Sequence, residues 1–146
     1  MSHWKRRARF RSATNTEPRK DAIGVTSMLM AMKDFSLKQH IVENTLSGNT
    51  KGGIYECAVA DALYKGGYRL YFYKNDSSQK EIDVIIQKDG VVIPIEVKSG
   101  NARANSLISL MKNSKDISVA YKFTDGNIGT SGDGILALPL YMAAFV

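Results

Sequence analysis

The sequence is poor in the residue types that form disulfides and zinc sites. Its 146 residues include one cysteine and two histidines, which excludes an internal disulfide and a structural zinc site with four Cys or His ligands. The longest apolar run, Ile135 to Val146, is interrupted by Pro139 and is shorter than the roughly 17–25 residues of a membrane helix. No G-x-x-x-x-G-K-[ST] segment occurs, so a P-loop nucleotide site is also excluded. These absences leave an ordinary single-domain protein, which we expect to be cytoplasmic.

Positive charge is concentrated at the start of the chain. The net charge is +6. Residues 1–20 contain seven of the Lys and Arg residues and a single acidic residue, so they carry this whole charge, while the other residues sum to zero. We expect residues 1–25 to form a basic, disordered arm and residues 26–146 to form one domain. The arm could contact nucleic-acid phosphates, and the alternative is a leader without a function.

The rest of the sequence predicts an α/β fold preceded by helical segments. Residues 36–46 have the apolar spacing of a helix that Ser47 and Gly48 would end, and residues 50–53 form a glycine-bearing link. Residues 54–65 are apolar nearly all round, which predicts a buried helix. The elements predicted after it are strands over 69–73, 81–87 and 91–97, a helix over 103–113, a strand over 117–123 and an edge strand over 135–138. The expected core order is therefore α-β-β-β-α-β.

Asp89 and Gly90 predict a tight hairpin. This dipeptide favours a two-residue type I′ turn, in which both residues have positive φ. Such a turn pairs Lys88 with Val91, which in turn puts Asp83 opposite Glu96 and Lys98 opposite Glu81. Because side chains alternate along strands, one face of the hairpin is expected to hold Ile82, Val84, Ile86, Ile93, Ile95 and Val97. The opposite face is expected to hold Glu81, Asp83, Glu96 and Lys98.

The charged end of this hairpin has two interpretations. Opposed carboxylates repel each other, so Asp83 and Glu96 would favour a cation between them. Lys98 supplies part of that compensation, and ligands made only of oxygen suit Mg²⁺ or Mn²⁺. The simpler interpretation is a solvated outer face on which charged residues alternate with core residues. The pattern of residues does not decide between the two.

The motif D-x₁₂-E-x-K, from Asp83 to Lys98, resembles the motif of the PD-(D/E)XK nuclease superfamily. The sequence resembles more closely the nuclease-like C-terminal domain, a domain of unknown function, of prokaryotic AAA+ family ATPases. Four segments carry this resemblance, in the order GGIYE (52–56), EID (81–83), IPIEVKSG (93–100) and LPLY (138–141). It extends from about Met28 to Val146. Residues 1–25 do not resemble the segment that precedes this domain in that family, and Ile82 stands where the superfamily has a proline.

The resemblance implies a restriction-endonuclease-like core, a mixed sheet flanked by helices, with extra N-terminal helices. It also implies metal-dependent hydrolysis of phosphodiester bonds in DNA. Asp83, Glu96 and the Val97 carbonyl would bind Mg²⁺ or Mn²⁺, and Glu56 would contact a metal-bound water or a second ion. Lys98 would orient or deprotonate the attacking water, or stabilise charge on the phosphate. The catalytic residues would thus be Asp83, Glu96, Lys98 and Glu56.

Alternatives remain open at this point. An acid such as Glu56 in the first turn of a helix is also favoured by the helix dipole alone. The whole domain could be a non-catalytic docking or regulatory module with the nuclease fold, or a gene fragment without a function of its own. The expected partner is nucleic acid or an AAA+ ATPase module, and no membrane is expected.

Overall fold

The computed structural model describes residues 11–12, 35–43, 45–46, 48–74, 81–100, 102–130 and 134–146. The predicted arm lies outside the described residues except for Arg11–Ser12, and residues 26–34 lie outside them as well. No helix in the described ranges has the length and apolar character needed to cross a membrane.

The described chain forms an α/β fold with one mixed sheet. Its strands follow the order β1-β2-β3-β4-β5-β7-β6, antiparallel except for the parallel pairs β4–β5 and β5–β7. The predicted order of helices and strands in the core is confirmed. The elements are β1 (Arg11–Ser12), α3 (Phe35–Val42), α4 (Gly48–Lys65), β2 (Tyr71–Lys74), β3 (Glu81–Lys88), β4 (Val91–Lys98), α5 (Asn105–Asn113), β5 (Ala120–Thr124), β6 (Gly129–Thr130), β7 (Ile135–Pro139) and the 3₁₀ helix η2 (Leu140–Ala144).

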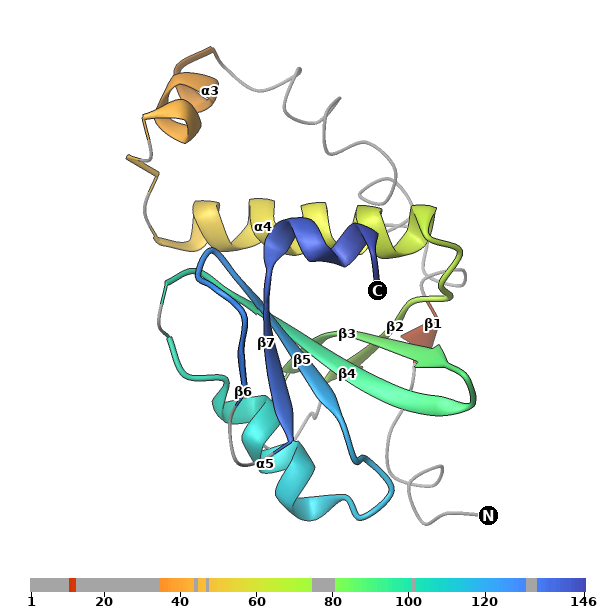
Figure 1. The fold of residues 1–146 in the computed structure, drawn as a ribbon. Coiled ribbons are helices and arrows are strands. Elements are labelled where there is room, and N and C mark those ends of the chain that lie inside the picture. Colours follow the sequence, from red (N-terminus) through yellow and green to blue (C-terminus); the bar gives the residue numbers. More distant parts are fainter. Residues whose placement is uncertain are drawn as a thin grey trace.

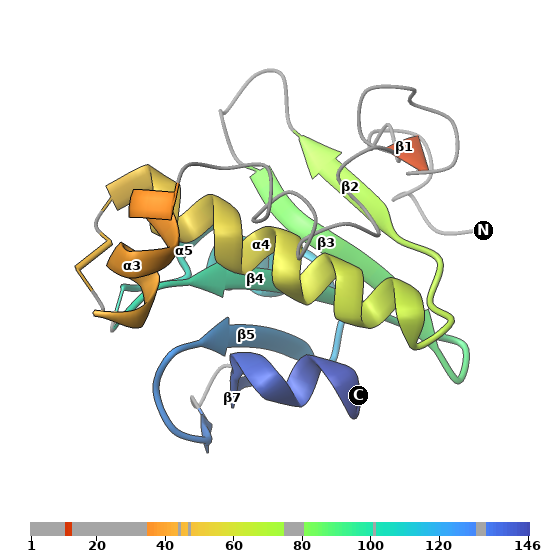
Figure 2. The same cartoon turned by 90° about the horizontal axis from the view of Figure 1, so that it is seen from above.

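Helices cover both faces of the sheet (Figure 1). Helix α4 and η2 lie together on one face, with α4 across β3 and β4 (Figure 2) and η2 against β5 and β7. Helix α5 packs against β3 and β4 from the other face. The first core cluster includes Leu63, Ile95 and Phe123, and the second includes Leu107 and Ile85. The face that the sequence predicts to be polar is therefore largely a second core.

The predicted hairpin is confirmed. Asp89 has φ 51° and Gly90 has φ 81°, the positive values that a type I′ turn requires. Strands β3 and β4 pair in the predicted register from Lys88↔Val91 to Val84↔Ile95. This register directs Asp83 and Glu96 to the same end of the hairpin.

One part of the predicted alternation is wrong. Between β2 and β3, Tyr71 pairs with Ile85 while Tyr73 pairs with Ile82, so β3 has one more residue than β2 across this interval. Such a bulge moves the side chains on one side of it to the opposite face of the sheet. Ile82 consequently packs in the cluster around Leu107, whereas Val84 packs in the cluster under α4. Asp83 lies between these two residues, at the bulge itself.

Other elements also differ from the prediction. The helix predicted over 36–46 ends at Val42. Helix α4 begins at Gly48, so the expected link over 50–53 is helical. A glycine costs a helix up to about 1 kcal/mol, and the packing of α4 on η2 and β4 acts against that penalty. Strand β7 is not an edge strand, because it lies between β5 and β6. Its parallel pairing with β5 is a long-range contact that local sequence pattern does not report.

Candidate active site

The last residues of β4 carry an ion pair. Lys98 Nζ lies 2.9 Å from Glu96 Oε1, and these side chains are 33% and 3% exposed. Glu96 Oε2 accepts a hydrogen bond of 3.1 Å from the Leu107 amide in the first turn of α5. Both oxygens of this buried carboxylate therefore have partners. Glu96 is not part of a solvated outer face.

Glu96 also supplies the cap that α5 lacks. The residue before the helix is Ala104, which has no side chain that can accept a hydrogen bond from the first turn. Leu107 occupies the third helical position, whose amide an N-cap side chain ordinarily binds. A carboxylate at this position also interacts favourably with the helix dipole. The ion pair on β4 is thus fixed to α5.

Asp83 reaches the same strand from the bulge in β3. Its Oδ2 accepts a hydrogen bond of 2.7 Å from the Val97 amide. Burial raises the pKa of Asp83 from 3.8 to about 6, against the Val97 hydrogen bond, which lowers it. The negative charges of Glu56 and Glu96 raise this pKa further, and the positive charge of Lys98 lowers it. Asp83 is therefore a carboxyl group whose charge is costly in this environment.

The structure brings all four predicted side chains into one electrostatic cluster, which we call the acid–lysine centre: Glu56, Asp83, Glu96 and Lys98. Burial lowers the pKa of Lys98, but the hydrogen bond and charge of Glu96, together with the charges of Asp83 and Glu56, outweigh burial and raise this pKa. Glu56 lies on the exposed side of α4. Three carboxyl groups thus act on one ammonium group.

The donor atoms of this centre suit a hard cation. Among the described residues, no group of three or more His, Cys, Asp and Glu side chains forms a ready-made metal site. Mg²⁺ does not need one, because it is commonly held by one or two carboxylates and keeps several waters. Asp83, Glu96 and the Val97 carbonyl offer oxygen ligands of this kind. Their surplus of negative charge over Lys98 would be reduced by a divalent ion.

Sequence reasoning missed a second polar cluster beside this centre. Asp125, directly after β5, accepts a hydrogen bond of 2.6 Å from the Gly100 amide and pairs with Lys51 at 3.1 Å. Lys51 also lies over the Tyr55 ring, 5.5 Å from its centroid. No local sequence pattern identifies Asp125 as a site residue, because its sequence context is typical of the start of a loop. Only the adjacent parallel strands β4 and β5 bring it to Gly100.

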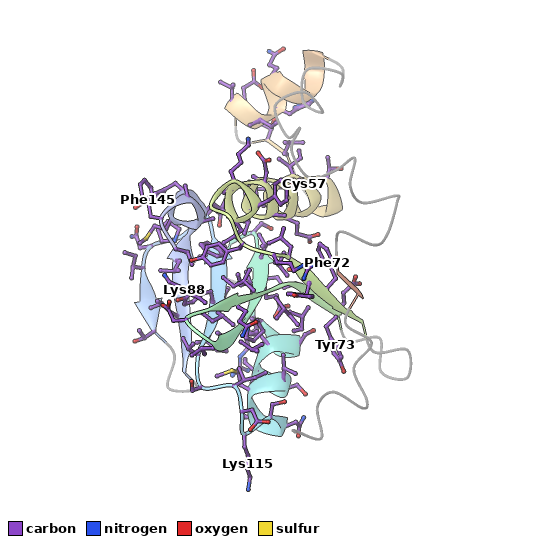
Figure 3. All side chains as sticks on the ribbon, turned by 90° about the vertical axis from the view of Figure 1, so that its right-hand side faces the viewer. Cys57, Phe72, Tyr73, Lys88, Lys115 and Phe145 are labelled. Atoms are coloured by element: carbon purple, nitrogen blue, oxygen red, sulfur yellow. The ribbon has the colours of Figure 1, made fainter. Side chains whose placement is uncertain are left out.

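The basic side chains in and around α5 do not join this cluster. Figure 3 shows Lys115 pointing away from the body of the molecule, just beyond α5. Arg103 and Lys112 are likewise exposed. No ion pair from any of these three to the acid–lysine centre is present among the described residues.

Comparison with known proteins identifies one family. A family model described as a domain of unknown function (DUF4143) matches residues 51–142. No curated protein and no solved structure matches the chain. The matched range runs from α4 to η2 and contains every residue of the acid–lysine centre, as well as Lys51 and Asp125.

Proposed function

This chain belongs to the family described as a domain of unknown function (DUF4143), and we propose that its acid–lysine centre hydrolyses phosphodiester bonds in DNA with a divalent metal ion. The observation that carries the proposal is the Lys98–Glu96 ion pair beside Asp83, at the junction of β3, β4 and α5. Its residue types and spacing resemble those of the PD-(D/E)XK nucleases. The described order of helices and strands, with its mixed sheet, agrees with a restriction-endonuclease-like core.

The residues of the acid–lysine centre would have different roles, which follow from their charges. Asp83, Glu96 and the Val97 carbonyl would hold Mg²⁺ or Mn²⁺, which when bound activates water and neutralises the scissile phosphate. The raised pKa of Lys98 keeps its ammonium group protonated at neutral pH. Lys98 is therefore expected to donate hydrogen bonds to the attacking water or the phosphate and to stabilise negative charge there. It is not expected to remove a proton.

Glu56 would act from the helix that covers this end of the sheet. Its charge already reaches Asp83 and Lys98. From the exposed side of α4 it could accept a hydrogen bond from a water at the centre. We further propose that the partner of this domain is nucleic acid or an AAA+ ATPase module, as the resemblance in sequence implies.

The test is a nuclease assay with Mg²⁺ or Mn²⁺ on single-stranded, duplex and branched DNA. Lys98→Met should lower the cleavage rate about 100-fold or more, as expected for loss of a charged group that stabilises the transition state. Asp83→Asn should weaken Mn²⁺ binding, measured by calorimetry, while leaving the protein folded. The matched control is Lys65→Met, which breaks the 2.6 Å ion pair between Lys65 and Asp61 near the end of α4. This control should cleave like the parent.

Two outcomes would count against a nuclease. Metal binding without cleavage of any substrate would favour a docking module that retains the fold. If Mn²⁺ does not raise the melting temperature of the parent by mass action, and Asp83→Asn behaves like the parent, then the centre is only a structural ion-pair network.

A further inference from the structure

Asp125 joins three segments that surround the acid–lysine centre. Its Oδ1 accepts the Gly100 amide at 2.6 Å. Its Oδ2 lies 3.1 Å from Lys51 Nζ, and the two side chains are 28% and 18% exposed. The preceding residue, Thr124, donates its hydroxyl to the Gly100 carbonyl at 3.0 Å. The end of β5 thus binds both backbone groups of Gly100 and one side chain of α4.

Each of these contacts lies close in the chain to a residue of the centre. Gly100 follows Lys98 by two residues, and Lys98 itself pairs with Thr124 in the parallel register. Lys51 precedes Glu56 by five residues on α4, which is about one and a half helical turns. Glu56 and Lys98 therefore stand on segments that Asp125 contacts and connects.

We propose that Asp125 is a positioning residue, which holds Lys98 and Glu56 in place relative to Asp83. Its two oxygens have different tasks: Oδ1 fixes the turn after β4, and Oδ2 fixes the start of α4 through Lys51. The inference rests on the proposed function for its catalytic consequence. Its geometric part is independent of any activity.

The charges and the backbone support this role. The hydrogen bond from Lys51 to Asp125 raises the pKa of Lys51. Burial opposes the charge of Asp125, but the Gly100 amide and Lys51 outweigh burial and lower the pKa of Asp125. Both groups are therefore charged at neutral pH. Gly100 has φ 64°, a left-handed conformation that glycine adopts without strain, and in this conformation its amide donates to Asp125.

The experiment compares Asp125→Ala, Asp125→Asn and the control Lys65→Ala in the full chain. The first readout is the backbone amide spectrum, in which the Val97 signal reports the bond to Asp83 and the Leu107 signal reports the bond to Glu96. Asp125→Ala should shift both signals and weaken Mn²⁺ affinity about 10- to 100-fold, as for other residues that orient metal ligands indirectly. Asp125→Asn keeps an acceptor for Gly100 but loses the ion pair, so its effect should be smaller. Lys65→Ala should change neither readout.

Each result separates this inference from the proposed nuclease. If the Val97 and Leu107 signals and Mn²⁺ affinity are unchanged in Asp125→Ala, and only the melting temperature falls, Asp125 is a stabilising residue and the inference is overturned, whatever Lys98→Met does. If both signals shift while the parent cleaves no substrate, the positioning role stands and the nuclease proposal fails. Asp125→Asn, which preserves the backbone bond, keeps the test decisive should the alanine variant not fold.

Discussion

Asp83 is a side chain whose negative charge is disfavoured by its surroundings in the folded protein. The bulge in β3 places this carboxyl group against the Val97 amide, where burial and two neighbouring carboxylates disfavour its charge. One backbone hydrogen bond and the charge of Lys98 offset only part of that cost. A residue with a pKa shifted in this way is a candidate for function on physical grounds.

Asp83 should make stability depend on pH. Its pKa is raised from 3.8 to about 6 in the folded state, so between these values the folded protein binds more protons than the unfolded chain, and stability falls as pH rises through this window. Asp83→Asn removes this loss. The variant should match the parent near pH 4 and exceed it by up to about 3 kcal/mol near pH 7.5, at about 1.4 kcal/mol for each pKa unit.

Urea unfolding of both proteins at the two pH values measures the effect. Asparagine can still accept the Val97 hydrogen bond, so the comparison isolates the charge. An equal difference in free energy of unfolding at pH 4 and pH 7.5 would contradict the assignment.

Among the elements, α5 depends most on a residue far from it in sequence. Ala104 provides no capping side chain, and Glu96 on β4 takes over that role at Leu107. The same carboxylate binds Lys98. The stability of one helix end and the placement of the ammonium group are therefore coupled.

Glu96→Ala should loosen the first turn of α5. Loss of an N-cap acceptor costs about 0.5–2 kcal/mol, so the amides from Asn105 to Leu107 should exchange with solvent several-fold faster. Hydrogen exchange followed by NMR measures this directly. Glu96→Gln retains an acceptor and should protect Leu107 better than alanine does. Equal protection of Leu107 in the parent and the alanine variant would show that the cap is not needed.

The hairpin of β3 and β4 depends on its turn. Gly90 has φ 81°, which costs about 1–2 kcal/mol for a residue with a Cβ. Gly90→Ala should therefore lower the free energy of unfolding by about that amount, measured in urea, without changing Mn²⁺ binding. Asp89→Asn, a residue that tolerates positive φ, is the matched control and should be close to neutral. A neutral Gly90→Ala would show that the turn relaxes to another form.

At the scale of the whole molecule, the apolar core and the excess of positive charge belong to different parts of the chain. Two apolar clusters fill both faces of the sheet. The net charge of +6 belongs to residues 1–20, and the rest of the chain is balanced. Any long-range attraction to a polyanion should therefore come from the N-terminal segment, whereas the acid–lysine centre is locally negative.

The basic segment should account for most of the salt dependence of DNA binding. Replacing Arg6, Arg7 and Arg9 by glutamine removes three charges and leaves Arg11–Ser12 unchanged. The slope of log affinity against log salt concentration should become shallower by up to about 3, since each phosphate contact contributes about 0.9. Fluorescence anisotropy with a duplex at several salt concentrations measures it. An unchanged slope would move the binding surface to the folded part of the chain.

The sequence by itself determined what depends on neighbours along the chain. Asp89 and Gly90 fixed the turn, and the turn fixed the register that brings Asp83 and Glu96 to one end of the hairpin. The spacing of two between Glu96 and Lys98 put both side chains on one face, where they form an ion pair. These features follow from turn geometry and strand periodicity, which are local properties.

Tertiary structure alone decided the rest. The bulge that turns Ile82 over depends on pairing with β2, and the burial of Glu96 depends on α5 packing over a face that alternation predicts to be polar. Asp125 meets Lys51 and Gly100 because β5 lies parallel to β4 beneath the start of α4. Parallel pairing and helix packing join residues distant in sequence, and their energy comes from buried area and long-range hydrogen bonds that leave no periodic pattern in the chain.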